Sequence, residues 1–285
     1  DVLNMLPGMA GKLKDVEIDE NALKKPEAII RSLLTDDQRH TMNLFSLILS
    51  GGNPFFRTDE SSYVIAQSDE KSPLWAWFDP AMTQSALREA ADILTQRLGL
   101  NPSLTITTPP ENSGPVLEQV SALYGRRPKP GMTLNVYVCR RVTAPRVSGS
   151  MLRPSAEHKP VIARLLVQMV RDADGQSIPH SAADRFAEAA VGSDSLFLWQ
   201  DGEVCSMAMI ASRDQETARI NTVVTKRSRR GHGYAGMLVA EMSRLLLGQG
   251  LLPLLYADAS NPASNRAYQK IGFEQVGRVT EYRWK

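Results

Sequence analysis

Short apolar segments alternate with longer amphipathic ones along this chain, and this alternation restricts the fold more than any other feature. Their apolar periodicity predicts strands at residues 63–67, 74–78, 104–108 and 132–142, and then at 196–200, 204–211, 218–225, 254–257, 273–276 and 279–284. It predicts one or two helices within residues 26–49, and further helices at 85–98, 114–124, 156–170, 181–190, 235–247 and 262–271. Strands that alternate with helices are typical of α/β units. Because the order strand–strand–helix–strand–helix–strand occurs twice, the sequence predicts a structural repeat.

The length of 285 residues agrees with two domains of about 150 residues each. A short polar stretch at residues 143–150, which contains Pro145, separates the two runs. We therefore expect one domain at residues 1–145 and another at 146–285. Residues 1–25 are polar and weakly periodic, and we interpret them as a flexible lead-in to the first domain.

The composition excludes several classes of protein. Hydrophobic residues make up 42% and charged residues 22%, which is typical of a folded globular chain and not of a disordered one. The 33 basic and 31 acidic side chains nearly balance, so we expect neither nucleic acid nor a membrane as a partner. No leader-like segment is seen, and the most apolar stretch, residues 245–257, is too short to span a bilayer. We expect a cytoplasmic protein.

The two cysteines and four histidines do not form a recognisable site. Cys139 and Cys205 lie in separate apolar strands, which predicts buried free thiols and a reducing compartment. The four histidines are scattered without the spacing of metal ligands, so no metal is expected.

The segment at residues 219–247 carries the clearest chemistry. An apolar strand leads into a turn rich in arginine and glycine, and an apolar helix follows at once. Gly231 and Gly233 allow the backbone to approach an anion closely, and the helix N-terminus adds a partial positive charge. Arg229 and Arg230 supply full charges for phosphate oxygens. This turn predicts a pyrophosphate site, although a basic turn without a ligand has the same local pattern.

A second segment makes the interpretation more specific. The spacing Arg-x-x-Gly-x-Ala occurs at Arg230, Gly233 and Ala235, and residues 261–273 read Asn-Pro-x-Ser-Asn-x-x-Tyr-x-x-x-Gly-Phe. Together the two motifs resemble those of the GNAT (GCN5-related) N-acetyltransferases, over residues 151–285. The resemblance implies an α/β (α+β) fold of tandem GNAT-like domains, each with a mixed, mostly antiparallel twisted sheet flanked by helices. It also implies acetyl-CoA as the co-substrate, without a metal.

The resemblance also implies roles for individual residues. Backbone groups of the strand before the loop, at Val223, Val224 and Thr225, would bind the pantetheine arm. The pyrophosphate would be bound by the following loop, which comprises Arg229, Arg230, Gly231, His232, Gly233, Tyr234, Ala235 and Gly236. Asn261, Ser264 and Asn265 would lie near the pantetheine or the thioester.

The implied mechanism is direct attack of an amine on the thioester carbonyl. Tyr268 matches the tyrosine that protonates the leaving thiolate in this family. The strand at residues 218–224 has no carboxylate, although many members of the family carry a glutamate there. Asp258 is the nearest candidate for the base, but capping of the following turn is an equally good interpretation. Alternatively, Asn221 and Thr222 could order a water molecule.

The first half has the element order but lacks these motifs. Residues 79–84, which precede its helix, contain neither glycine nor a basic residue, and Asp79 and Pro80 are unsuited to a pyrophosphate. We expect a degenerate GNAT-like half that walls the acceptor pocket or stabilises the other half.

The acceptor is expected to be a small-molecule amine, with a peptide or protein amine as the alternative. An acyl-CoA-binding regulatory module without turnover is a further alternative, and the protein is expected to be a monomer or a homodimer.

Overall fold

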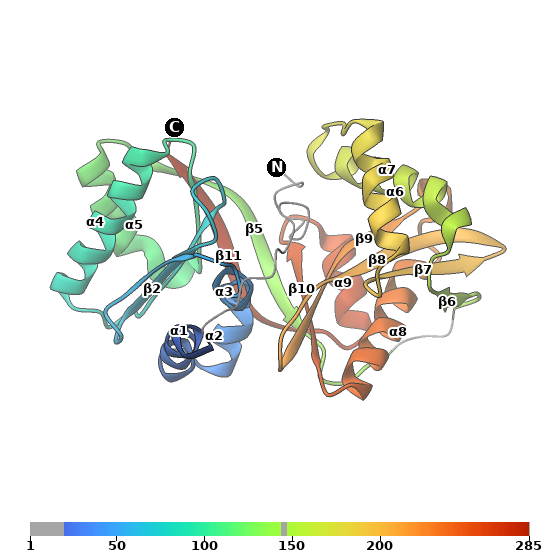
Figure 1. Cartoon of the computed structure of the whole chain (residues 1–285), viewed down its shortest axis with the longest axis horizontal. Helices are drawn as coiled ribbons and strands as arrows, with labels where there is room; N and C mark the ends of the chain where they lie inside the picture. The colour runs from blue at the N-terminus through green and yellow to red at the C-terminus, as the bar shows by residue number, and fades with distance from the viewer. Residues whose placement is uncertain (1–19, 144–146, 285) are drawn as a thin grey trace. The chain divides into compact units, whose positions relative to one another are not determined.

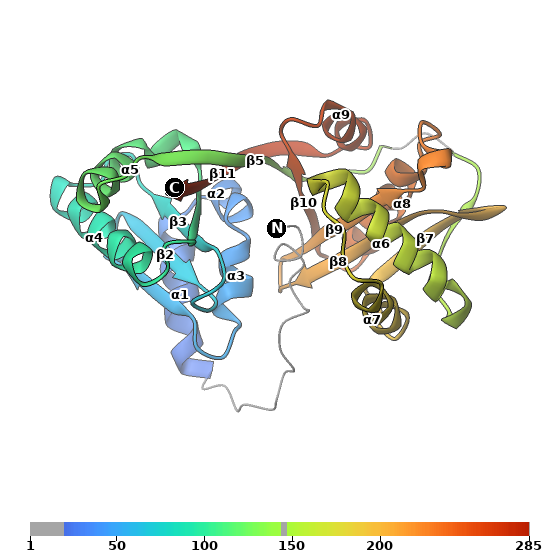
Figure 2. The ribbon, with the colours of Figure 1, turned by 90° about the horizontal axis from the view of Figure 1, so that it is seen from above.

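The computed structural model describes residues 20–143 and 147–284, which form two compact units (Figures 1 and 2). Unit 1 comprises Tyr137–Tyr256 and Pro262–Glu274. Unit 2 comprises the described residues up to Val136, the short segment Ala257–Asn261 and the described residues from Gln275 on. The predicted boundary between residues 145 and 146 lies outside the described residues, as does most of the predicted lead-in.

The sheet of unit 2 has the strand order β1-β2-β3-β4-β11-β5. Its strands are β1 (Phe55–Thr58), β2 (Tyr63–Gln67), β3 (Leu74–Phe78), β4 (Thr105–Thr108), β11 (Glu274–Trp284) and β5 (Pro128–Val138), the last of which continues into unit 1. Strands β3 and β4 are parallel, whereas the pairs β1–β2, β2–β3 and β4–β11 are antiparallel.

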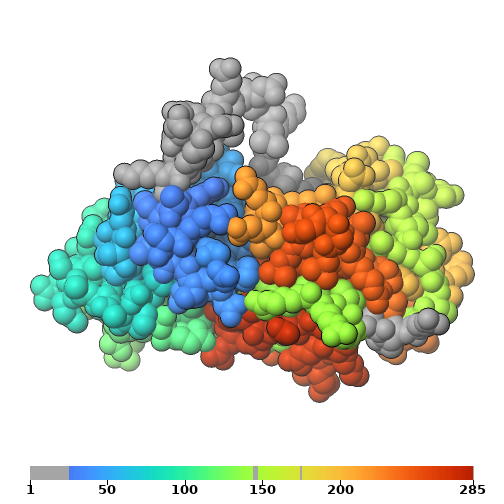
Figure 3. All heavy atoms as spheres, turned by 90° about the horizontal axis from the view of Figure 1, so that it is seen from below, coloured from blue at the N-terminus to red at the C-terminus, as the bar shows by residue number. Residues whose placement is uncertain are grey.

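Helices cover both faces of this sheet. They are α1 (Glu20–Leu33), α2 (Asp36–Thr41), α3 (Leu44–Leu49), α4 (Gln84–Leu100) and α5 (Pro110–Tyr124). Figure 1 shows α4 and α5 on one side of β2 and α1 to α3 on the other, and the blue atoms of Figure 3 are the surface of that second layer. Side chains alternate along a strand, so Tyr63 and Ile65 of β2 join the core beneath α4 and α5, together with Trp284.

The strands of unit 1 are the remaining part of the same hydrogen-bonded order, β5-β10-β9-β8-β7-β6. Its further strands are β6 (Ser150–Leu152), β7 (Leu196–Asp201), β8 (Glu203–Arg213), β9 (Thr217–Thr225) and β10 (Leu252–Asp258), and its helices are α6 (Lys159–Asp174), α7 (His180–Val191), α8 (Tyr234–Gly248) and α9 (Pro262–Lys270). Helices α6 and α7 pack on Leu196, Leu198, Met207 and Val224. Helix α8 lies on the opposite face (Figure 1). Cys139 and Cys205 are buried free thiols, as expected.

The predicted repeat is present, and so is the mixed, mostly antiparallel architecture. The series β3-α4-β4-α5-β5 corresponds to β9-α8-β10-α9-β11, and each series begins with a parallel pair of strands. The last strand of each series joins the sheet of the other: β11 pairs with β4 in unit 2, and in unit 1 the amide of Cys139, which follows β5, donates to Pro253 O at 2.9 Å.

Several predicted elements need correction. The two closing strands expected at residues 273–276 and 279–284 are one continuous strand, β11. Residues 26–49 contribute to three helices, not one or two. The short strands β1 and β6 were not predicted, because three or four residues show too little alternation to be recognised.

Candidate active site

Strand β9, which the sequence analysis assigns to the pantetheine arm, contains a bulge. Along the β8–β9 ladder Met207 is opposite Val224 but Met209 is opposite Asn221, so β9 has one extra residue in this interval. Thr222 lies there with a φ of 53°. A β-branched residue rarely adopts this left-handed conformation, and such strain is characteristic of functional positions.

The bulge coincides with the end of the pairing between β9 and β10. These parallel strands are in register from Thr217 opposite Leu252 to Ile220 opposite Leu255. Among the described residues no pairing between the two strands continues beyond that point. Residues 221–225, which include Val223, Val224 and Thr225, therefore lie where β9 and β10 have separated.

The loop after β9 leaves a row of backbone donors at the start of α8. Gly231 and Gly233 both have a φ of 82°, and no side chain caps the helix at Gly233. Among the described residues, no acceptor is found for the six successive amides from Gly231 to Gly236, which include those of His232, Tyr234 and Ala235. Such a row of unsatisfied N–H groups at a helix N-terminus is suited to an anion.

The cations of the loop are paired with two carboxylates. Lys226 Nζ lies 2.5 Å from Glu203 Oε2 and Arg229 Nε 2.8 Å from Glu203 Oε1, while Arg227 and Arg230 both contact Asp172. Hydrogen bonds from Arg227 and Arg230 lower the pKa of Asp172, and those from Lys226 and Arg229 lower the pKa of Glu203. With Asp201, which also lies beside the loop, four positive and three negative charges leave an excess of one positive charge near the free amides.

Two loop side chains face the protein. The Tyr234 hydroxyl donates to Asp201 Oδ2 at 2.6 Å, and the ring of His232 stacks on that of Tyr234 with centroids 5.5 Å apart. Because these contacts occupy both side chains, a ligand of the loop would meet the amides of His232 and Tyr234.

Helix α9 presents Asn265 and Tyr268 to an aromatic cluster in unit 1. The Tyr137 hydroxyl donates to Asn265 Oδ1 at 2.8 Å, and the ring of Tyr268 lies 6.5 Å from that of Tyr137 and 6.0 Å from that of Phe273. Burial raises the pKa of Tyr268 to about 12. No hydrogen-bond partner for its hydroxyl is found in the described part of the chain. Ser264, on the same helix, is partly buried.

Asp258 and Asn261 lie in the turn between β10 and α9, which belongs to unit 2. Asp258 Oδ1 accepts hydrogen bonds from the amide and the hydroxyl of Ser260, both at 2.8 Å, and the Asn261 amide donates to Asp258 O at 3.0 Å. Asp258 therefore stabilises the turn, in agreement with the alternative interpretation of this residue. Asn221 on β9 accepts a hydrogen bond at 2.9 Å from the Thr222 hydroxyl.

The corresponding helix of the first half begins differently. Helix α4 is capped by Thr83, whose hydroxyl accepts from the Ala86 amide at 3.2 Å, and Asp79 Oδ1 accepts from the Ala81 amide at 2.7 Å. At the start of α4, side chains therefore accept hydrogen bonds from backbone amides, whereas the corresponding amides at the start of α8 have no such acceptor among the described residues. This supports the expectation that the first half lacks a pyrophosphate site.

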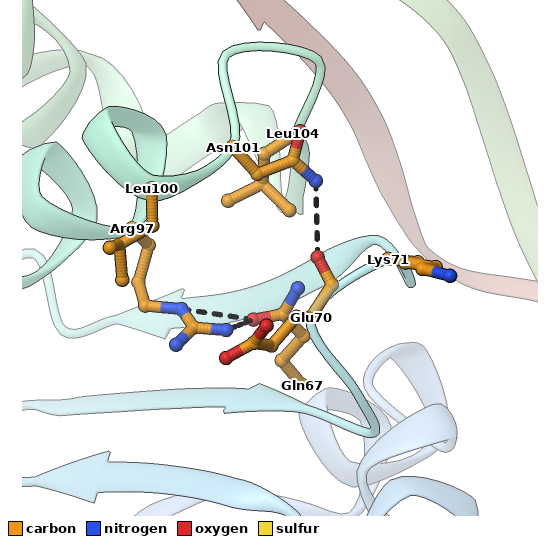
Figure 4. Close-up of a pocket in the computed structure, with 7 residues that line it drawn as sticks. All are labelled: Gln67, Glu70, Lys71, Arg97, Leu100, Asn101 and Leu104. Carbon is orange, nitrogen blue, oxygen red and sulfur yellow. Dashed lines mark hydrogen bonds between the residues drawn. The ribbon is translucent and has the colours of Figure 1, made fainter.

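Unit 2 does contain a cavity of about 280 Å³, lined by seven residues that include Gln67, Glu70, Arg97 and Asn101 (Figure 4). Arg97 Nη2 donates to Gln67 Oε1 at 2.5 Å, and Asn101 Nδ2 donates to Glu70 O at 3.0 Å (Figure 4). None of the lining residues belongs to the two motifs. We assign no function to this cavity.

Sequence reasoning did not identify Tyr137, Asp172 or Glu203. Asp172 lies on α6, far from the loop in sequence, and no local spacing links it to Arg227 or Arg230. Glu203 begins β8, whose start pairs with the end of β9, and only this pairing of strands brings it to the loop.

Within the described residues, no group of three or more His, Cys, Asp or Glu side chains is placed to hold a metal ion. No helix in the described part of the chain has both the length and the apolar character needed to cross a membrane.

Comparison with known proteins agrees with this geometry. Residues 199–284 match the family model described as FR47-like protein. No curated protein matches the chain. Among solved structures, a GNAT-family acetyltransferase from Colwellia psychrerythraea aligns over 96% of this chain and 100% of its own, with a TM-score of 0.58 and 15% identity. A GCN5-related N-acetyltransferase from Kribbella flavida aligns over 86% of this chain and 93% of its own, with the same TM-score and identity.

A GCN5-related N-acetyltransferase-like protein from Streptococcus suis covers 93% of this chain and 99% of its own, at 17% identity and a TM-score of 0.51. At these identities the likeness is one of fold. The chain is therefore a protein of the GNAT fold, built from two tandem repeats, whose C-terminal part from residue 199 to residue 284 is FR47-like.

Proposed function

We propose that this protein is an acetyl-CoA-dependent N-acetyltransferase that acts on a small-molecule amine. The observation that carries the proposal is the row of free amides from Gly231 to Gly236, beside an excess of positive charge and directly after the bulged strand β9. A pyrophosphate would give these amides and the helix N-terminus the anion that they lack. The GNAT fold supports acyl transfer as the reaction class.

In this proposal the donor binds along β9, the loop that follows it and the start of α9. The backbone of Val223, Val224 and Thr225, where β9 has parted from β10, binds the pantetheine arm. The loop amides hold the pyrophosphate, and Arg229 and Arg230 exchange part of their contact with Glu203 and Asp172 for phosphate oxygens. Asn261, Ser264 and Asn265 lie toward the pantetheine and the thioester.

The chemistry is a direct transfer. The nitrogen of a neutral amine attacks the thioester carbonyl, the C–N bond forms, and the C–S bond breaks as the electron pair leaves on sulfur. Tyr268 donates its proton to that sulfur. With a pKa of about 12 the phenol is protonated at neutral pH, as a proton donor must be. The proton of the amine passes to a water molecule ordered by Asn221 and Thr222, or to Asp258.

The experiment is a thiol-release assay with acetyl-CoA and a broad panel of primary amines, combined with calorimetric titration of acetyl-CoA. We expect 1:1 binding and CoA release that depends on the amine. If neither acetyl-CoA nor another short acyl-CoA binds, the proposal is wrong.

A regulatory acyl-CoA-binding module is the second candidate. It is favoured by the lack of a carboxylate on β9 and by the engagement of Asp258 in its turn. Binding of acetyl-CoA without transfer to any small-molecule, peptide or protein amine would support this candidate.

A further inference from the structure

Arg219 on β9 is a buried cation for which the described residues provide no counter-ion. Its side chain is 6% exposed, and its Nη2 atom has no hydrogen-bond partner among the described residues. Its recorded contacts are a long hydrogen bond of 3.4 Å from Nε to Ser212 Oγ and the ring of Tyr256, whose centroid lies 6.0 Å from the guanidinium carbon. Neither partner carries a negative charge at neutral pH.

Such an arrangement is unfavourable in a protein that binds nothing at this point. A buried charge is tolerated when it is paired, and unsatisfied buried polar atoms are rare enough to require an explanation. Burial lowers the pKa of Arg219, but a guanidinium keeps its proton at neutral pH. A bound anion would supply the negative charge that none of the described residues provides.

The position of Arg219 along β9 indicates which molecule. The phosphate loop follows Thr225, the proposed pantetheine contacts span Val223 to Thr225, and the bulge is at Thr222. Arg219 lies on the other side of the bulge, about 10 Å before it at about 3.3 Å per residue. Since the donor approaches from the loop, this end of β9 belongs to the acceptor.

The surroundings of Arg219 also fit the acceptor side. On the neighbouring strand β8, Ser212 is opposite Arg219 and Met209 is opposite Asn221. Met209 packs against the core under α6 and α7. Residues two apart on a strand share a face, so Arg219 and Asn221 both point to that side of the sheet. A group bound by Arg219 would thus lie on the same face as the residue proposed to order the water.

We propose that Arg219 binds a carboxylate of the acceptor, so that the substrates are amines that carry a carboxylate group, such as amino acids. This inference rests on the proposed function. A guanidinium fork matches the two oxygens of a carboxylate, and one cation balances one carboxylate charge. The ring of Tyr256 faces the guanidinium and can hold its plane while the carboxylate binds.

The test compares matched amines: L-phenylalanine, L-phenylalaninamide and phenethylamine, with the same trio built from L-leucine. In the wild-type protein we expect kcat/KM for the acids to exceed that for the amides and amines by at least tenfold. In Arg219→Met, KM for the acids should rise at least tenfold and the preference should vanish, while the Kd of acetyl-CoA stays unchanged. Arg219→Lys should recover part of the preference, since it keeps the charge but not the fork.

If Arg219 served only to stabilise the fold, Arg219→Met would lower the Tm. Because this substitution removes an unpaired buried charge, we instead expect a Tm equal to or above that of the wild-type protein. If the wild-type protein prefers the amides or shows no preference, or if Arg219→Met retains the preference for acids, the inference is wrong.

A second measurement separates this inference from the proposed function. N-acetyl-L-phenylalanine and its amide are titrated into the full-length protein with CoA present, which requires no turnover. If acetyl-CoA and CoA fail to bind, the proposed function fails, and the acids are then titrated alone. If acetyl-CoA binds but acids and amides bind wild type and Arg219→Met equally, only the carboxylate site fails.

Discussion

Tyr268 is the residue on which the proposed chemistry depends most. Its ring packs with those of Tyr137 and Phe273, and burial raises its pKa to about 12. We expect Tyr268→Phe to lower kcat by about 100-fold, the usual contribution of a general acid, with an unchanged Kd for acetyl-CoA. Tyr124→Phe, a tyrosine of unit 2 outside the site, is the matched control and should leave kcat unchanged. Equal loss in both variants, or none in Tyr268→Phe, would exclude this role.

The same pKa predicts the pH dependence of the reaction. A phenol whose pKa is raised above 10 stays neutral through pH 10, so Tyr268 remains able to donate its proton there. We therefore expect loss of the Tyr268 proton to cause no decline of kcat below pH 10. Any decline of kcat below that pH should be the same in the wild-type protein and in Tyr268→Phe. A decline near pH 8 or 9 that Tyr268→Phe removes would contradict the raised pKa.

Single residues also show how far the sequence is informative. Gly231, Gly233 and Tyr268 could be identified because their roles follow from local spacing within one loop and one helix. Arg219 could not, because a basic residue in a strand is ordinary until burial and the lack of a counter-ion are known. Tyr137 reaches Asn265 across 128 positions of sequence, a contact that pairing of distant strands creates.

At the scale of elements, the bulge in β9 predicts that glycine is more stable than alanine at position 222, which is the reverse of their order in a regular strand. In a regular strand, glycine is less stable than alanine by about 0.5–1 kcal/mol. Thr222 has a φ of 53°, a conformation that costs non-glycine residues about 1–2 kcal/mol. We therefore expect Thr222→Gly to have a higher free energy of unfolding than Thr222→Ala, by about 1 kcal/mol. Denaturant titration of both variants measures this, and a less stable glycine variant would show that β9 is regular there.

The continuity of β11 explains an error of prediction and gives a second test. The sequence predicts separate strands at residues 273–276 and 279–284, yet one strand continues through Gly277. Thr41 packs against this glycine: an added Cβ would lie 2.1 Å from Thr41 Oγ1. We expect Gly277→Ala to lower the free energy of unfolding by about 1–3 kcal/mol. Gly114→Ala on α5, where nothing lies within 4 Å of the added Cβ, should instead raise it by about 0.5–1 kcal/mol. A neutral Gly277→Ala would mean that Thr41 moves aside freely.

At the scale of the whole molecule, β5 and β11 each pair with strands of the other half, and this exchange decides which parts of the chain can fold alone. Most strands and helices of the second half were predictable from periodicity, but the pairing of β11 with β4 was not, because periodicity says nothing about the partner of a strand. Trp284 of β11 lies in the core of unit 2 at 2% exposure. We expect a fragment of residues 1–145 to lack cooperative unfolding, and a cooperative transition to appear when a β11 peptide is added. The predicted division at residue 145 gains support if the fragment unfolds cooperatively by itself.

The central claim is that one of the two repeats binds acetyl-CoA, through the amides at the start of α8. Calorimetric titration of acetyl-CoA tests it most directly. We predict one molecule bound per chain, and a Kd at least tenfold weaker in Gly233→Ala, where φ is 82° and the added Cβ would lie 3.3 Å from Val147. Gly125→Ala is the control, since this glycine also has a positive φ but lies at the end of α5 in unit 2, which does not contain the loop. Absence of binding, two molecules per chain, or equal affinity in all three proteins would contradict the account.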